Sequence, residues 1–190
     1  MPRLFTALMV PPPIARELAA LRGGLFGARW IDAENYHVTL RFVGDVDRQF
    51  ARNFGVELGQ IEREPLALSI DGLDCFGGDR PRAIVARVRA DPALAALQAE
   101  HERAARRAGS PPEPRKYVPH VTLARLRGAS HEAVADYLGA RWFAKPLRFE
   151  AGDFALLSSR DSVGGGPYAV EARYALGRAG LTRHPLRRAL

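Results

Sequence analysis

The chain has 190 residues, of which 47% are hydrophobic and 26% are charged, and its formal net charge is +7 at pH 7. These values fit one globular domain with a buried core, and the positive charge favours a polyanionic partner, although an arginine-rich composition alone produces the same number. The single cysteine excludes an intramolecular disulfide and a cysteine-rich zinc site, and without a signal peptide or an apolar run of about 18 residues we expect a cytoplasmic protein that does not enter a membrane.

The first half of the chain predicts alternating strands and helices. Short apolar or alternating runs are typical of strands, and apolar residues three and four positions apart are typical of helices that bury one face. Pro12 or Pro13 can open the first helix, and Asp47 can cap the second. The predicted order is strand, helix, strand, helix, strand, over residues 4–10, 14–25, 37–43, 48–61 and 66–70.

The same order begins again in the second half. Asp91 followed by Pro92 is a helix-start signal, Gly109 closes that helix, and Ser130 can cap the next one, which carries Val134, Leu138 and Trp142 on one side. Residues 162–167 are predicted to join the last two strands. The predicted strands cover 83–88, 118–126, 147–157 and 168–176, and the predicted helices cover 92–108 and 131–142.

This repetition indicates an internal duplication, which constrains the fold more than any single motif. We expect one bilobal domain over residues 1–176, made of halves 1–78 and 79–176 that pack about an approximate twofold axis. Residues 177–190 contain four arginines and little periodicity, so they are interpreted as a loose basic tail.

Two identical tetrapeptides, His37-Val38-Thr39-Leu40 and His120-Val121-Thr122-Leu123, lie 83 residues apart (positions 37 and 120) in equivalent predicted strands. Residues two apart on a strand share a face, so each histidine should point the same way as the threonine that follows it. Two opposed strands of this kind would gather two imidazoles and two hydroxyls around one polar cavity.

Such a set suits the hydrolysis of a strained phosphodiester. One imidazole can take a proton from the attacking water while the other protonates the departing ribose oxygen, since the ordinary histidine pKa of about 6.5 lies near neutral pH. In-line displacement places the attacking and leaving oxygens on opposite sides of phosphorus, and the hydroxyls can donate to the non-bridging oxygens. No metal or other cofactor is expected, because a zinc site at His37 and His120 would lack a third ligand with matching spacing.

The chain resembles the 2H phosphoesterase superfamily, and within it the RNA 2′,3′-cyclic phosphodiesterase family, also called 2′-5′ RNA ligase. The resemblance covers nearly the whole chain and rests on the paired His-x-Thr-x motifs, on Arg29-Trp30-Ile31 and Asn35-Tyr36 before the first, and on Ala124-Arg125 after the second. It implies an α+β, bilobal fold with two pseudo-twofold-related halves and the motifs in a central cleft. It also implies hydrolysis of RNA 2′,3′-cyclic ends to 2′-phosphates and, for some members, reverse 2′-5′ joining of tRNA halves.

The same resemblance implies roles for individual residues. His37 would be the proton donor and His120 the proton acceptor, while Thr39 and Thr122 would bind the substrate phosphate. Arg125 would be a further phosphate or ribose contact, but strict alternation along its strand places it on the opposite face from His120 and Thr122.

Several alternatives stay open at this point. Phe42 can stack on a base, but alternation favours core packing, and Arg41 on the predicted His37 face can either hold substrate or be a solvated charge. The substrate can be RNA, such as a tRNA fragment, or a small cyclic nucleotide or 2′-5′ oligonucleotide. A non-catalytic RNA-end binding protein is the competing class, and a monomer is expected in each case.

Overall fold

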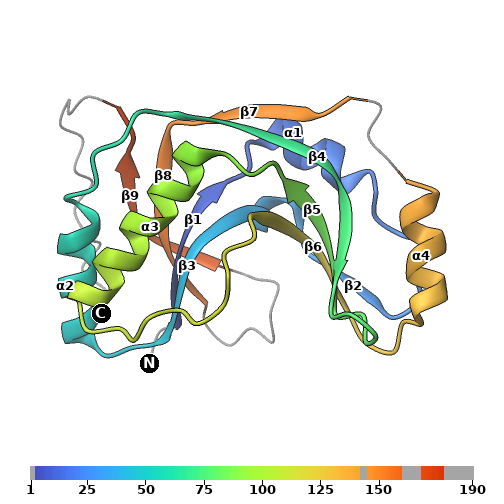
Figure 1. The fold of residues 1–190 in the computed structure, drawn as a ribbon, viewed down its shortest axis with the longest axis horizontal. Coiled ribbons are helices and arrows are strands. Elements are labelled where there is room, and N and C mark those ends of the chain that lie inside the picture. Colours follow the sequence, from blue (N-terminus) through green and yellow to red (C-terminus); the bar gives the residue numbers. More distant parts are fainter. Residues whose placement is uncertain (1–2, 142–144, 160–167, 178–190) are drawn as a thin grey trace.

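A computed structural model of the chain describes residues 3–141, 145–159 and 168–177. It has strands and helices in one α+β arrangement, so the predicted fold class is confirmed (Figure 1). The strands are β1 Arg3–Met9, β2 Ala28–Trp30, β3 His37–Asp45, β4 Leu66–Phe76, β5 Ala83–Val88, β6 His120–Leu126, β7 Leu147–Ala151, β8 Asp153–Ser159 and β9 Tyr168–Ala175. The helices are α1 Pro12–Ala19, α2 Arg48–Leu58, α3 Pro92–Arg107 and α4 His131–Gly139, with a 3-10 turn, η1, over Ala33–Asn35.

All nine strands of the described residues join one antiparallel sheet in the order β7-β4-β5-β6-β3-β1-β8-β9, and β2 also pairs with β6. At its centre β3 and β6 share a single paired position, Val38 opposite Val121. These are equivalent residues of the two tetrapeptides. We call β3, β1, β8 and β9 the first wing of the sheet, and β6, β5, β4 and β7, with β2, the second wing.

Each wing contains elements from both halves of the sequence. The first wing takes β8 and β9 from the second half, and α3 of that half packs against β3 and α2. The second wing takes β2 and β4 from the first half, with α1 against β7 and α4 against β4. Figure 1 shows α2 and α3 together at one end of the molecule and α4 at the other. Within the described part of the chain, no helix has the length and apolar character needed to cross a membrane.

The predicted helix caps are confirmed. The side chain of Asp47 accepts a hydrogen bond from the backbone of Phe50 (2.7 Å), and the Ser130 hydroxyl accepts one from Ala133 (3.1 Å). Asp91 accepts from two backbone amides of the first turn of α3. These bonds satisfy amides that have no partner within the helix, which fixes where α2, α3 and α4 begin.

Some predicted boundaries were wrong. Helix α1 ends at Ala19 and does not reach Leu25. Gly23 and Gly24 have positive φ angles of 94° and 72°, which exclude a helix through these two positions. The segment 147–157 forms two strands in different wings: β7 is the edge strand of the second wing, and β8 lies between β1 and β9 in the first wing. Trp142, the connection 162–167 and nearly all of the predicted tail lie outside the described residues.

Candidate active site

The two histidines occupy matching positions and are held in the same way. His37 is the first residue of β3 and His120 the first of β6. The Nδ1 atom of His37 lies 2.7 Å from the carbonyl oxygen of Asn35, and that of His120 lies 2.7 Å from the carbonyl oxygen of Val118. Since a carbonyl only accepts, each Nδ1 carries the proton and donates it, which leaves Nε2 of both rings for proton exchange with a substrate.

The pairing of Val38 with Val121 brings the two motifs side by side at the seam between the wings. Both valines are fully buried, whereas the histidines and threonines on either side of them are partly exposed. The sheet face that carries His37, Thr39, His120 and Thr122 is called the motif face below. The structure therefore brings together the four side chains that the sequence pattern selected.

Arg125 also reaches the motif face, because β6 contains a bulge. In the pairing with β5, Ile84 lies opposite Ala124 but Val85 lies opposite Thr122, so Leu123 has no partner of its own. Leu123 and Ala124 are both buried, and Arg125 is exposed. The strict alternation expected for this strand was wrong, since an extra residue reverses the facing of every residue after it.

The same bulge occurs in β3, one residue after Thr39. Thr6 of β1 lies opposite Arg41 and Ala7 lies opposite Thr39, so Leu40 is the unpaired residue. Arg41 is consequently buried with only 5% of its surface exposed, while Phe42 turns outward and is 42% exposed. Both expectations from alternation were wrong here: Phe42 does not pack in the core, and Arg41 does not share the face of His37.

Phe42 and Arg125 thus take equivalent places in the two halves, and both line one cavity of about 240 Å³ beside His37. Aromatic rings that the sequence analysis did not select surround this histidine. The rings of Phe5 and Tyr168 lie 5.1 and 5.4 Å from the His37 ring. The sequence alone could not indicate Phe5 and Tyr168, because these rings approach His37 only when β1 and β9 join the same wing as β3. The cavity lining is Arg3, Phe5, His37, Thr39, Phe42, Arg125, Ser159 and Tyr168.

Residues 10–162 match the family model of the 2′-5′ RNA ligase superfamily. The chain belongs to this superfamily. Among curated relatives, the RNA 2′,3′-cyclic phosphodiesterase of Escherichia coli is 28% identical over 178 residues, 92% of this chain and 96% of that protein. The enzyme of the same name from Bacillus subtilis is 27% identical over 85% of this chain and 86% of its own length. That of Aeropyrum pernix is 38% identical over 101 residues, 52% of this chain and 57% of that protein.

Solved structures of other proteins share this fold. Escherichia coli LigT complexed with 3′-AMP superposes with a TM-score of 0.73 at 24% identity, covering 93% of this chain and 99% of that one. The protein TT0787 of Thermus thermophilus superposes with a TM-score of 0.74 at 21% identity, covering 91% of this chain and 97% of that one. The similarity extends over both wings, so the arrangement of the sheet is that of these proteins.

The surroundings of both imidazoles in this superfamily member disfavour the charged form and lower the two pKa values. Burial, with smaller contributions from the nearby positive charges of His120 and Arg125, lowers the pKa of His37 to about 4 against the opposing hydrogen bond to the Asn35 carbonyl. Burial and Arg125 also lower the pKa of His120, against its bond to Val118. A bound anion would oppose these effects, because negative charge stabilises the imidazolium form.

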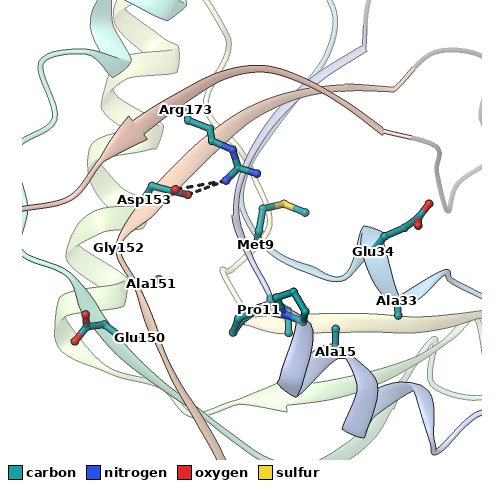
Figure 2. Close-up of a pocket in the computed structure, with 12 residues that line it drawn as sticks. Met9, Pro11, Ala15, Ala33, Glu34, Glu150, Ala151, Gly152, Asp153 and Arg173 are labelled. Atoms are coloured by element: carbon teal, nitrogen blue, oxygen red, sulfur yellow. Dashed lines mark hydrogen bonds and ion pairs between the residues drawn. The ribbon is translucent and has the colours of Figure 1, made fainter. Parts of the chain in front are cut away.

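A larger cavity, of about 560 Å³, lies between α1, η1 and the turn from β7 to β8 (Figure 2). Its charged groups are Glu34, Glu150 and the Asp153–Arg173 ion pair of 3.1 Å, so its net charge is negative. A phosphodiester would be repelled there, whereas it would be attracted by Arg125 in the smaller cavity, where the other arginine, Arg3, is paired with Asp45 (3.2 Å). The charges therefore favour a phosphate site at the histidines. Among the described residues there is also no group of three or more His, Cys, Asp or Glu side chains positioned to hold a metal ion.

Proposed function

We propose that this protein hydrolyses the 2′,3′-cyclic phosphodiester at RNA ends to a 2′-phosphomonoester, with His37 as proton donor and His120 as proton acceptor. The observation that carries the proposal is the matched pair of imidazoles, each with Nδ1 engaged and Nε2 available, at one seam that also presents Arg125. The names of the Escherichia coli and Bacillus subtilis relatives support the same reaction.

The proposed reaction is a single in-line displacement. Nε2 of His120 takes a proton from water as the water oxygen bonds to phosphorus. The bond from phosphorus to the ribose 3′ oxygen breaks on the opposite side, and that oxygen receives the proton from Nε2 of His37. The phosphate stays on the 2′ oxygen, and the two imidazoles exchange protonation states until solvent resets them.

The remaining polar groups of the motif face would bind the phosphate. The hydroxyls of Thr39 and Thr122 would donate to the two non-bridging oxygens, where charge accumulates in the transition state. The guanidinium of Arg125 would supply a fixed positive charge, as expected from its influence on both histidine pKa values. The phosphate would in turn raise the pKa of His37, so that substrate binding itself charges the proton donor.

The rings of Phe5, Phe42 and Tyr168, which we call the aromatic wall, give the substrate an orientation. In the proposed reaction the ribose oxygen departs toward His37, so the terminal nucleoside lies on the His37 side. The aromatic wall lies on that side, and aromatic rings are the usual partners of unpaired RNA bases. A 5′-hydroxyl that attacks in place of the water would give a 2′-5′ linkage by the same displacement, with the same bond to the ribose 3′ oxygen broken. We infer that the substrates are tRNA fragments in the cytoplasm. We also infer that the active form of the protein is a monomer.

To test this, the protein is incubated in excess EDTA with an oligoribonucleotide that ends in a 2′,3′-cyclic phosphate, and the 2′- and 3′-phosphate products are separated. We expect a 2′-phosphate from the wild type, and a 3′-phosphate would contradict the assigned leaving group. Complete loss of activity in EDTA, restored by zinc or manganese, would contradict the metal-independent mechanism.

Two variants then separate the roles of the histidines. His37→Ala and His120→Ala should each lose on the order of 10²–10⁴-fold in rate on the RNA end. With a p-nitrophenolate leaving group, which departs without a proton, only His37→Ala should recover. Recovery of His120→Ala alone would reverse the two roles, and activity unchanged in both variants would favour an RNA-binding role for the motif.

A further inference from the structure

Arg29 lies in β2, a three-residue strand that pairs with β6 beyond the bulge. In this pairing Arg29 stands directly opposite Arg125, with Ala28 opposite Leu126 and Trp30 opposite Ala124. Directly opposite residues in an antiparallel pair project from the same face, with Cβ atoms about 5 Å apart. The two arginines are therefore neighbours on one side of the sheet.

That side is the motif face. Arg125 lines the cavity beside His37. Trp30, the next residue of β2, points the other way and packs against the ring of Tyr137 in α4, at 5.7 Å between centroids. Since adjacent strand residues face opposite sides, Arg29 projects away from the helices, and its side chain is exposed there.

Two positive charges in directly opposite positions destabilise a strand pair. Within the described residues neither guanidinium makes an ion pair or hydrogen bond with a carboxylate. The rest of this cross-strand row supplies no negative charge either, because Ala83 lies opposite Arg125 on β5 and Phe76 lies opposite Ala83 on β4. Bound anions would offset the repulsion between the two arginines, and two guanidinium groups side by side can hold two phosphate groups.

We propose that Arg29 binds the phosphodiester that precedes the terminal nucleoside, while Arg125 binds the cyclic phosphate. This inference rests on the proposed function. An RNA end carries one cyclic phosphate, and the next anion along the strand is the diester one nucleotide away. A site for two anions thus selects an RNA strand over a nucleoside 2′,3′-cyclic phosphate, which has only one.

The experiment compares Arg29→Gln with the wild type on three substrates. They are a nucleoside 2′,3′-cyclic phosphate with a free 5′-hydroxyl, the same compound with a 5′-phosphate monoester, and a dinucleotide with the same cyclic end. Arg106→Gln is the matched control, because Arg106 is an exposed arginine on α3, which covers the opposite face.

We expect Arg29→Gln to raise KM for the dinucleotide roughly tenfold, the loss of one charge-assisted contact at an exposed site. The first substrate should be unaffected, and the control should match the wild type on all three. The slope of log KM against log salt for the dinucleotide should also fall by about 0.7, the value for one phosphate contact to a single strand.

Other outcomes overturn the inference. An equal loss on all three substrates would mean that Arg29 acts at the cyclic phosphate. No loss on any would leave it without a role in binding. A loss on the 5′-phosphomonoester alone would indicate a mononucleotide ligand in place of an RNA strand.

A binding measurement separates this inference from the proposed function. A dinucleotide ending in a 3′-phosphate monoester presents a terminal phosphate and the preceding phosphodiester but contains no cyclic bond to open. If Arg29→Gln weakens its binding while the wild type opens no cyclic phosphate, the second anion site stands and the proposed reaction falls. If the wild type opens cyclic ends and the variant binds this dinucleotide normally, the proposed reaction stands and the second anion site falls.

Discussion

Replacing Arg41 with methionine would remove a buried guanidinium that ties β3 to the second half of the chain. Its Nε lies 2.6 Å from Oε2 of Glu102 in α3, and its Nη1 lies 3.3 Å from Oε2 of Glu113. Its Nη2 donates to the hydroxyl of Ser110 (3.2 Å) and to the carbonyl of Pro111 (2.6 Å). These four partners lie on α3 or on the connection from α3 to β6, and Nη1 also donates to the carbonyl of Phe42 in β3 (2.6 Å), so Arg41 couples the two motif strands at a second point.

The size of the effect follows from burial. Breaking a buried ion pair by removing one partner costs about 3–5 kcal/mol. The two carboxylates are 22% and 21% exposed and regain some water, and Glu113 keeps its contact with Arg115 (2.7 Å). The lower end of the range of about 3–5 kcal/mol therefore applies, and Arg41→Met should lower the free energy of unfolding by about 3 kcal/mol. In a protein of this size that corresponds to a fall in Tm of roughly 6–12 °C.

Activity should fall as well, because the connection that Arg41 holds carries Val118, whose carbonyl orients His120. A small displacement of a catalytic group lowers kcat by roughly ten- to a hundred-fold. Arg41→Lys keeps the charge but not the fork of donors, so it should recover part of both losses.

The assays are urea unfolding and steady-state kinetics on the cyclic RNA end, below the unfolding range of each variant. Arg173→Met is the control, because its ion pair with Asp153 is exposed on both sides and should contribute less than about 1 kcal/mol. A loss for Arg41→Met no larger than that of the control would refute the burial argument. A full loss of stability with unchanged kcat would refute the link to His120.

Three further predictions concern the site itself. Thr39→Val and Thr122→Val should each lower kcat by roughly ten- to a thousand-fold, and steady-state rates equal to the wild type would make the hydroxyls structural. Because one imidazole must be neutral and the other charged in the free enzyme, and both pKa values are lowered, kcat/KM should peak between about pH 4 and the ordinary histidine value near 6.5. An optimum above about pH 7.5 in the pH–rate profile would contradict this account. Phe42→Ala should raise KM for a nucleoside 2′,3′-cyclic phosphate by roughly 5- to 100-fold, the range of base stacking, and leave a base-free ribose cyclic phosphate unaffected. An equal effect on both compounds would place Phe42 outside base binding.

The sequence predicted those features of the fold that depend on neighbours along the chain. The caps at Asp47, Asp91 and Ser130 need only a side chain and the next turn of backbone, and all three form. The placement of His37 beside Thr39 needs only strand alternation over three residues. These patterns are local, so composition and spacing suffice to predict them.

The features that sequence reasoning missed depend on neighbouring strands. The bulges after Thr39 and Thr122 appear only in the register with β1 and β5, yet they decide that Arg125 and Phe42 face the site. Strand β2 exists because β6 offers it an edge, and three residues carry too little periodicity to reveal it. Alternation fails at these points because one unpaired residue reverses it.

The exchange of elements between the wings bears on how such a molecule could have arisen. Neither half of the sequence can complete a wing alone, since the first half contributes β4 to its neighbour and receives β8 in return. Two copies of an ancestral half could have exchanged the same strands in a strand-swapped homodimer. One histidine from each subunit would then have met where Val38 now pairs with Val121. Fusion of the two genes would then have freed equivalent positions to diverge. Position 42 would then have become the phenylalanine and position 125 the arginine that line the cavity beside His37, so the two halves of the site would no longer be equivalent.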